Sequence, residues 1–272
     1  MWTISPDAEV FAKHAEAFLA ADPVANTVPL TVLANLRAGL PAEGAYFAWW
    51  TDSGEVRGAA FRTPPHPLCL ARTPLESIGP LTGALRRLGT PIPEVTGPVE
   101  LTEAFTAEWG EPVGRVISER LYCLGTLGTP EVAGVGRVAG AADFGLLASW
   151  YQAFAAETGL NLDHDLPGHV RLRLERGDLR VWTVDGVPVS MAGVSLAAAG
   201  MCRIGPVYTP PSCRRRGYGA AVTAYASRVA LDERADRLVL FTDLDNPTSN
   251  AIYQAVGYEP VSDYAHVVFE VR

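Results

Sequence analysis

Hydrophobic and polar residues follow each other along the second half of the chain in segments that predict alternating strands and helices. Two apolar stretches, Leu179–Val184 and Val187–Val194, flank an Asp-Gly pair at 185–186, which favours a two-residue hairpin. Residues 238–241 are apolar throughout, as in a strand that is buried on both faces. Apolar residues at helical spacing predict a helix over 217–234, whose buried face carries Val222, Tyr225, Ala226 and Val229.

The remaining segments of this half complete a mixed order of elements. We expect a short strand at 136–139, a helix capped by Asp143, a helix at 169–176, a strand at 201–208, a short helix capped by Thr248 or Ser249, and a closing hairpin of 258–260 with 265–271. The mixture of both element types indicates a fold with a sheet that is covered by helices.

The N-terminal half runs through a similar order. Strands are predicted at 2–4, 46–51, 56–62, 67–71, 93–96 and 116–124, and helices after the cap Asp7 and at 28–40, 75–88 and 100–109. This recurrence predicts an internal repeat of one fold. Gly, Thr and Pro cluster between Gly125 and Gly136, which is where we expect the linker.

Composition fits a folded protein of two domains, with 272 residues, 48% of them apolar and 19% charged. The chain shows neither an apolar run of about 18 residues nor a secretory signal, so we expect no membrane span and a cytoplasmic location. The four cysteines are scattered without a C-x-x-C pair, so no metal site or disulfide framework is predicted. The net charge of −8 argues against a nucleic-acid partner.

Candidate chemistry lies in the loop between the strand at 201–208 and the helix at 217–234. This loop and the first helical residues read Arg214, Arg215, Arg216, Gly217, Tyr218 and Gly219. The two glycines lack a Cβ, so a phosphate can lie against the backbone. Unpaired N–H groups and the helix dipole favour negative charge at a helix N-terminus. We therefore predict an anion cradle at this point.

A second signature follows the apolar strand at 238–241. Residues 246–258 read Asn-Pro-Thr-Ser-Asn-Ala-Ile-Tyr-Gln-Ala-Val-Gly-Tyr. A short glycine pattern alone is a weak signal, whereas both signatures in this order are far more specific. Together they resemble the acetyl-CoA-binding core of the GNAT superfamily of acyl-CoA-dependent N-acyltransferases, whose loop reads Arg/Gln-x-x-Gly-x-Gly/Ala. The resemblance is close from about Gly134 to the C-terminus and faint before it.

The resemblance implies an α/β (α+β) protein with two tandem GNAT-like domains, each a mixed, mostly antiparallel twisted sheet flanked by helices. We expect a degenerate domain at 1–128 and a catalytic domain at 134–272. Residues 73–79 occupy the phosphate-loop position of the first copy without the Arg-x-x-Gly-x-Gly pattern, and Phe105 lies near the place of Tyr253. Acetyl-CoA is therefore expected only in the second copy.

The resemblance also implies a metal-free enzyme that moves an acetyl group from the co-substrate acetyl-CoA to a primary amine. Transfer is expected to be direct, in a ternary complex, because no Cys–His or Ser–His pair is evident. Tyr253 is implied as the general acid for the leaving thiolate, and the Val207 N–H as the donor to the oxyanion. The implied acetyl-CoA-binding residues are Val207, Tyr208, Thr209, Arg214, Arg215, Arg216, Gly217, Tyr218, Gly219, Asn246, Asn250 and Tyr253.

Several alternatives stay open. Tyr253 can instead be a packed tyrosine with its OH on a carbonyl, Asn246 a turn residue and Asn250 a helix cap. The strand at 201–206 carries no acid, so the general base is open between a water chain and six side chains: Glu157, Asp163, His164, Asp165, Asp243 and Asp245.

The partners are equally open. The amine acceptor is unidentified, although an acidic protein suits a cationic amine, and a homodimer is compatible with the sequence. A regulatory protein that binds acyl-CoA without turnover is the main alternative function. A P-loop nucleotide-binding protein is disfavoured, because the loop lacks the Gly-Lys-Ser/Thr ending.

Overall fold

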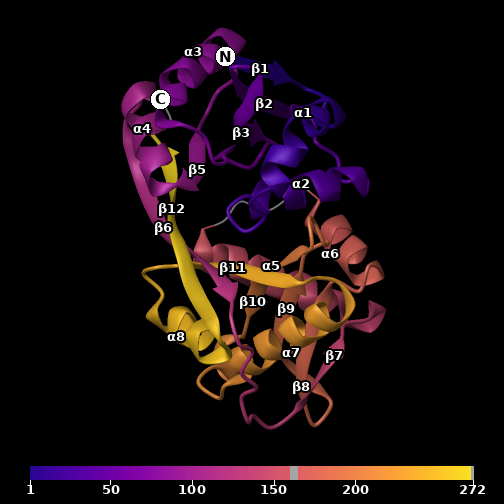
Figure 1. Cartoon of the computed structure of the whole chain (residues 1–272). Helices are drawn as coiled ribbons and strands as arrows, with labels where there is room; N and C mark the ends of the chain where they lie inside the picture. The colour runs from indigo at the N-terminus through magenta and orange to yellow at the C-terminus, as the bar shows by residue number, and fades with distance from the viewer. Residues whose placement is uncertain (160–164, 271–272) are drawn as a thin grey trace. The chain divides into compact units, whose positions relative to one another are not determined.

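The computed structural model describes residues 1–159 and 165–270, which form two compact units (Figure 1). Unit 1 consists of Met1–Leu121, Asp243–Asp245 and the described part of Val261–Arg272. Unit 2 consists of Tyr122–Thr242 and Asn246–Pro260. The long strands β6 and β12 each contribute residues to both units.

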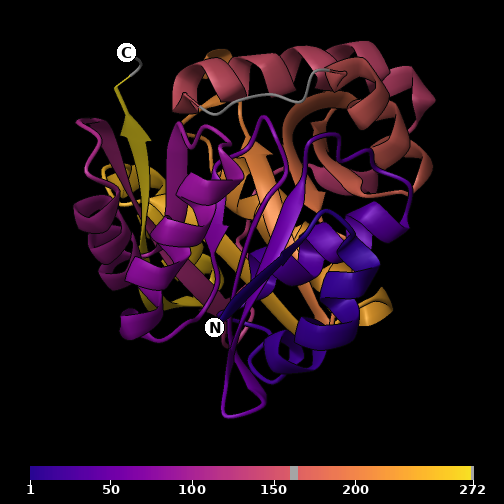
Figure 2. The same cartoon turned by 90° about the horizontal axis from the view of Figure 1, so that it is seen from above.

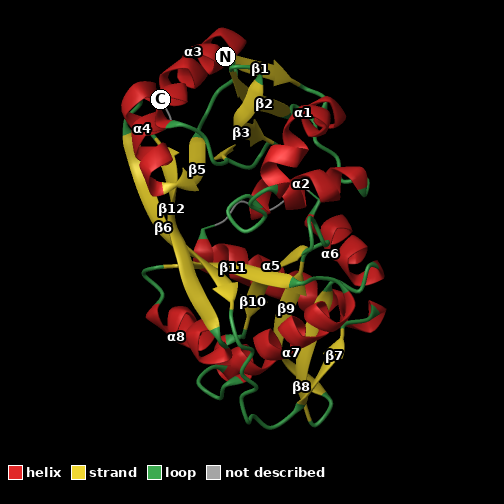
Figure 3. Cartoon of the chain, in the orientation of Figure 1, coloured by secondary structure: helices red, strands yellow, loops and turns green. Residues whose placement is uncertain are grey.

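The order of elements in the first half is repeated in the second half (Figure 3). The first series is β1 (Trp2–Ser5), α1 (Ala8–Ala20), α2 (Thr27–Arg37), β2 (Tyr46–Asp52), β3 (Glu55–Arg62), β4 (Leu68–Leu70), α3 (Ile78–Leu88), β5 (Glu94–Pro98), α4 (Val99–Trp109) and β6 (Val113–Leu124). The second is β7 (Val135–Val138), α5 (Phe144–Thr158), α6 (Leu166–Glu175), β8 (Leu179–Val184), β9 (Val187–Val194), β10 (Met201–Tyr208), α7 (Tyr218–Glu233), β11 (Arg237–Asp243), α8 (Pro247–Val256) and β12 (Tyr258–Phe269). The predicted internal repeat is confirmed. Within the described ranges, no helix is both long and apolar enough to cross a membrane.

Unit 1 is a mostly antiparallel sheet between two pairs of helices. Its strand order is β1-β2-β3-β4-β5-β12-β6, and β4 and β5 are parallel. Helices α1 and α2 lie on one side of the strands, and α3 and α4 lie on the other (Figure 2). Phe11 of α1 contacts Phe47 of β2, whereas Leu81 of α3 and Phe105 of α4 share an apolar cluster with Val95 of β5.

Unit 2 repeats this arrangement in the order β6-β11-β10-β9-β8-β7, with β10 and β11 parallel. Successive strand residues point to opposite faces of the sheet. Met191 therefore joins Leu147 of α5 in one apolar cluster. Its neighbour Ala192 joins Val222 of α7 and Tyr253 of α8 in another. Helices α5 and α6 cover one face of this sheet, and α7 and α8 cover the other.

The closing hairpin expected over 258–260 and 265–271 is wrong, because 258–269 form one strand, β12. Residues 264–268 pair antiparallel with residues 94–98 of β5. The Arg120 guanidinium of β6 also holds the Asp263 carboxylate at 2.6 Å. Turn-forming residues at 260–263 suggest a break locally, but pairing with a strand far away in the sequence keeps the chain extended.

Capping signals agree with the structure at one helix and differ at another. The Asp7 carboxylate accepts hydrogen bonds from the N–H groups of Glu9 and Val10, as predicted for the start of α1. Asp143 makes no such bond to α5. Its carboxylate instead accepts from the Gly140 N–H and from the Arg137 guanidinium, because Asp143 is the last residue of the preceding 3-10 turn, Ala141–Asp143.

The backbone at residues 73–79 of the first series differs from a glycine turn. None of the residues 73–79, all of them described, has a positive φ. Thr73 and Ser77 share a hydrogen bond of 2.7 Å between their hydroxyl groups. At the same end of the sheet, a Cβ on Gly97 of β5 would lie 2.8 Å from the Leu70 carbonyl of β4. Strands β4 and β5 therefore stay close together at Gly97.

Candidate active site

The two parallel strands at the centre of unit 2 pair over only part of their length. Residues 201–203 of β10 pair with 237–239 of β11. Beyond that point β10 continues to Tyr208 and β11 to Asp243, and no further pairing joins these fully described strands. The second half of β10 follows β9 instead, with an irregular register between Ile204 and Val207. Beyond residue 203 the backbone of β10 is thus not paired with β11.

The loop after β10 leads into the N-terminus of α7 through two left-handed residues. Arg215 has φ 64° and Gly217 has φ 80°. The first hydrogen bond of the helix runs from the Ala221 N–H to the Gly217 carbonyl at 3.0 Å. The N–H groups of residues 218–220 precede this ladder, so they remain available for an anion. The side chain of Tyr218, the first residue of the helix, is buried.

The two glycines of this loop serve different purposes. A Cβ on Gly217 would lie 2.8 Å from Val132 Cγ2, and its φ is one that other residues adopt only with strain. A Cβ on Gly219 would meet Thr209 Oγ1 at 3.5 Å and Ile252 Cδ1 at 3.6 Å, which are ordinary contacts. Gly217 is thus required by the backbone itself, whereas a Cβ fits at position 219.

Of the three successive arginines, Arg214 turns toward α5. Its Nε donates to the Thr209 carbonyl at 2.9 Å, and its Nη2 lies 2.8 and 2.7 Å from the two carboxylate oxygens of Glu157. The guanidinium also lies over the ring of Tyr208. Burial and the nearby Glu157 carboxylate raise the pKa of Tyr208. The side chains of Arg215 and Arg216 are exposed, so their positive charges lie at the surface of this loop.

Helix α8 is capped by Asn246, and not by Thr248 or Ser249 as expected. The Asn246 Oδ1 accepts from the Ser249 N–H at 3.0 Å, because this side chain stands before the first helical residue. Asn250 Nδ2 donates to the Asn246 carbonyl, and Asn250 Oδ1 accepts from the Tyr122 hydroxyl at 2.9 Å. Both asparagines therefore organise α8 and its contact with β6.

Tyr253 lies on the buried face of α8. It is 9% exposed and belongs to the same apolar cluster as Val207. Its ring meets that of Tyr258 edge to face, with centroids 6.3 Å apart. Burial raises the pKa of Tyr253 to about 12. In the part of the chain that the structure describes, no hydrogen bond ties its hydroxyl to a carbonyl. The raised pKa keeps the phenol protonated at neutral pH.

The candidates for the general base are dispersed. Asp165 caps α6 by accepting from the Gly168 N–H at 2.9 Å. Asp163 and His164 lie outside the described residues. The segment Asp243–Asp245 belongs to unit 1, where Asp243 accepts from the N–H of residue 245. Glu157, held by Arg214, lies beside the end of β10. Among residues 1–159 and 165–270, no cluster of His, Cys, Asp or Glu could hold a metal ion.

Three residues that sequence reasoning missed organise this region. Tyr122 is 1% exposed and holds Asn250, while Ser190 of β9 lies 2.8 Å from Thr209 Oγ1 and donates to the Tyr208 carbonyl. Arg173 of α6 donates to carbonyl groups of β9 and β10. Each acts across long sequence separations, so no local pattern marks it.

Comparison with protein-family models identifies part of the chain. Residues 147–258 match the sequence model of the acetyltransferase (GNAT) family. The matched part of the chain is a GNAT-family domain. No curated protein matches it. The matched range includes strands β10 and β11, the loop at 214–219 and Tyr253.

Solved structures resemble the chain over its whole length. One is a GNAT-family acetyltransferase from Colwellia psychrerythraea, with a TM-score of 0.65 and 13% identity over 99% of this chain and 100% of that chain. A GCN5-related N-acetyltransferase from Sphaerobacter thermophilus has a TM-score of 0.65 and 16% identity, covering 98% and 94%. A tandem GNAT protein from the clavulanic acid biosynthesis pathway has a TM-score of 0.59 and 12% identity, covering 98% of each chain.

At such low identities these neighbours show the fold alone. The predicted fold is confirmed: two tandem GNAT-like units, each a mixed sheet flanked by helices. The GNAT acetyltransferase fold supports acyl transfer in general.

Proposed function

We propose that unit 2 transfers an acetyl group from acetyl-CoA to a primary amine. The observation that carries the proposal is the pair of features at one end of the sheet, namely the parted strands β10 and β11 and the glycine loop before α7. The residues fit this substrate, because the N–H groups of 218–220 precede the helical ladder and can donate to an anion.

The pyrophosphate of acetyl-CoA would bind at this loop. Backbone N–H groups supply donors along the helix axis, and Arg215 and Arg216 add positive charge at the mouth. The pantetheine arm would then run along Val207, Tyr208 and Thr209 toward the opening between the strands. Thr209 is held by Ser190, which fixes this edge of the route.

The chemistry would proceed without a covalent enzyme intermediate. The amine nitrogen attacks the thioester carbonyl, and the Val207 N–H stabilises the negative charge that develops on the carbonyl oxygen. The C–N bond forms as the C–S bond breaks. The leaving thiolate takes a proton from Tyr253, whose buried phenol stays protonated at neutral pH. The ammonium proton passes to a base or to water.

Two observations bear on the acceptor side. Glu157 lies at the end of β10 but is engaged by Arg214, so water is the better candidate for accepting the amine proton. The net charge of −8 favours a cationic acceptor, because a negative field attracts it. Unit 1 would bind no CoA. None of residues 73–79 has a positive φ, and strands β4 and β5 stay close together at Gly97.

CoA release, detected with a thiol reagent, tests this proposal. The full chain should release CoA from acetyl-CoA only when a primary amine from a panel of polyamines, aminoglycosides and peptides is present. Amine-independent binding of CoA without turnover would favour the alternative, a regulatory protein that binds acyl-CoA. Absence of CoA binding would overturn both functions.

A further inference from the structure

The second half of β10 contains an irregularity that determines where its backbone N–H groups point. Ile204 pairs with Val194 and Val207 pairs with Ala192, so two residues of β10, at 205–206, stand opposite one residue of β9. Proline has no N–H, so the first backbone donor after this irregularity is the N–H of Val207. Its direction depends on the path of the chain through 205–206.

Arg173 of α6 holds this irregularity from one side. Its Nη1 donates to the Tyr151 hydroxyl at 2.6 Å, and its Nη2 donates to the Val194 carbonyl at 3.0 Å. Both nitrogens also lie 3.4 Å from the Gly205 carbonyl oxygen. A guanidinium is a planar fork with fixed donors, so it can join acceptors from α5, β9 and β10 at once.

The packing around Gly193 leaves no room for another position of the Arg173 guanidinium. Gly193 stands opposite the irregularity, and a Cβ there would lie 2.4 Å from the Gly205 carbonyl oxygen and 2.6 Å from Arg173 Nη2. The Gly205 carbonyl and the guanidinium therefore occupy the space beside Gly193. A larger residue at 193 would displace both.

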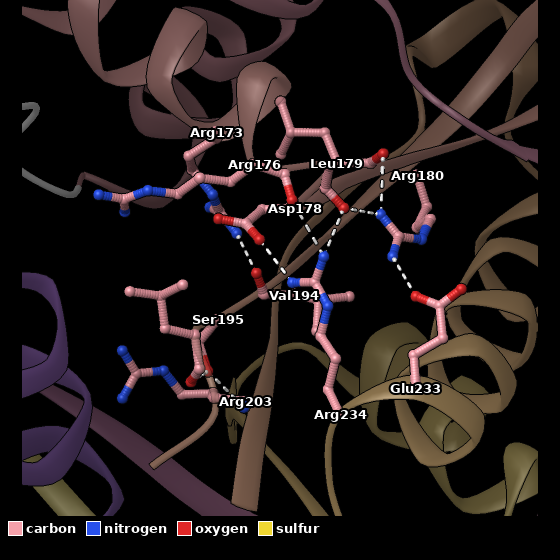
Figure 4. Close-up of polar contacts among 12 residues, drawn as sticks. Arg173, Arg176, Asp178, Leu179, Arg180, Val194, Ser195, Arg203, Glu233 and Arg234 are labelled. Carbon is pink, nitrogen blue, oxygen red and sulfur yellow. Dashed lines mark hydrogen bonds and ion pairs between the residues drawn. The ribbon is translucent and has the colours of Figure 1, made fainter. Parts of the chain in front are cut away.

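The segment after α6 is fixed as well, by a second arginine. Arg234 donates to the buried Asp178 carboxylate at 2.6 Å and to the carbonyls of Arg176 and Gly177 at 3.1 Å (Figure 4). The Val194 N–H donates to the Asp178 carbonyl at 2.8 Å. Both backbone polar groups of Val194 are thus held by residues 173–178. These hydrogen bonds fix the backbone next to Arg173.

We propose that Arg173 is a positioning residue for acyl transfer, which holds the Gly205 carbonyl and thereby aims the Val207 N–H at the thioester oxygen. The inference rests on the proposed function, in which this N–H stabilises the oxyanion. It names a role that neither the loop motif nor Tyr253 supplies. Since β10 loses its pairing with β11 after Arg203, the guanidinium replaces that support from the opposite side of the strand.

Arg173→Met, Arg173→Lys and the control Arg171→Met test the proposal in the full chain. Arg171 lies on the same helix, where its guanidinium covers the ring of Phe144 and is exposed. Arg173→Met should lower kcat by about 10²-fold, the scale expected when a reacting group is displaced by about 1 Å. Its Kd for CoA should stay within about threefold, a free-energy change below 1 kcal/mol. Arg173→Lys should recover part of kcat, and Arg171→Met should behave as wild type.

Hydrogen–deuterium exchange of the backbone amides supplies a second readout that needs no turnover. Arg173→Met should speed exchange at residues 204–208 and leave 237–243 unchanged. Wild-type kcat in Arg173→Met, or wild-type exchange at 204–208, would overturn the inference. Faster exchange throughout unit 2 would also overturn it, because Arg173 would then be a general stabilising residue. If the wild type transfers no acetyl group, the proposed function fails, and the exchange comparison still decides the role of Arg173.

Discussion

Arg214 and Glu157 lie 57 positions apart in the sequence and form an ion pair in which Nη2 is within 2.8 Å of both carboxylate oxygens. The pair joins the end of α5 to the loop that we propose for the pyrophosphate. Both side chains are nearly half exposed, so their attraction is worth about 0–1 kcal/mol. The arginine that the family signature places at the phosphate is therefore held by a carboxylate, although only weakly.

Glu157→Gln should release Arg214 toward the phosphates and tighten CoA binding by up to about fivefold, which corresponds to the upper limit of an exposed pair. Its kcat should change little. Isothermal titration and steady-state kinetics measure the two effects, with Glu175→Gln on exposed α6 surface as the charge-matched control. A fall in kcat of about 10²-fold or more would instead make Glu157 the general base.

Gly219 tests the position of the pyrophosphate. Gly219→Ala should keep the thermal shift by CoA, because a Cβ fits there and the family signature accepts alanine at this place. Gly219→Glu should lose most of that shift, which is about 2.7 kcal/mol at a hundred times Kd. Without ligand the glutamate variant should be no less stable than Gly219→Gln, since negative charge at a helix N-terminus is favourable. A full shift in Gly219→Glu would place the phosphates elsewhere.

Tyr253→Phe should lower kcat by about 10²–10⁴ and leave the Kd of CoA nearly unchanged, because the phenol acts only on the leaving thiolate. Tyr258→Phe is the matched control. Its hydroxyl bonds Ser227 at 2.8 Å, so this change should reduce stability by about 1 kcal/mol without affecting kcat. A loss of less than about threefold in Tyr253→Phe would leave water as the acid.

The pH dependence of kcat follows from the same residue. Burial raises the pKa of Tyr253 to about 12, above the ordinary value of 10. The phenol therefore stays protonated as pH rises through 10. The fall of kcat at high pH should then lie above pH 10. The same shift means that the stability contributed by the buried neutral phenol is complete below pH 10 and is lost between about pH 10 and 12. A limb near pH 8 that persists in Tyr253→Phe would belong to another group.

The fragment 134–272 should not fold, although the sequence places the catalytic domain there. Unit 2 begins at Tyr122, whose side chain is 1% exposed in the apolar core and holds Asn250 of α8. The N–H groups of Gly125 and Gly128 also bond the last carbonyls around α8, at 257 and 256. Circular dichroism should show no cooperative melt for this fragment. A cooperative melt with a thermal shift by CoA would show that residues before 134 are dispensable.

Features with a local cause could be predicted from the sequence. The Asp-Gly pair at 185–186 forms its hairpin because both residues take positive φ, 50° and 79°. The turn into α7 could be predicted for the same reason, because Gly217 takes a φ of 80°. The helix cap of α8 was predicted at the wrong residue, because several side chains at 246–250 can accept the same N–H and only their position relative to the first turn decides between them.

Features with a distant cause could not be predicted. Three successive arginines look alike in the sequence, and the contacts of Arg214 with Glu157 and the Thr209 carbonyl could not be read from it. Nothing near 258–271 shows that this segment pairs with β5. Arg173 lacked a signal because its acceptors lie on α5, β9 and β10. The domain boundaries at 128 and 134 and the roles of the site residues remain predictions.

The transfer of a ¹³C-labelled acetyl group from acetyl-CoA to a primary amine, followed by mass spectrometry, tests the central claim most directly. The account predicts one labelled amine for each CoA released by the wild type, and a rate lower by about 10²–10⁴ in Tyr253→Phe at saturating acetyl-CoA. Labelled acetate in place of labelled amine, or no transfer while acetyl-CoA is bound, would contradict the assignment of unit 2 as an N-acetyltransferase.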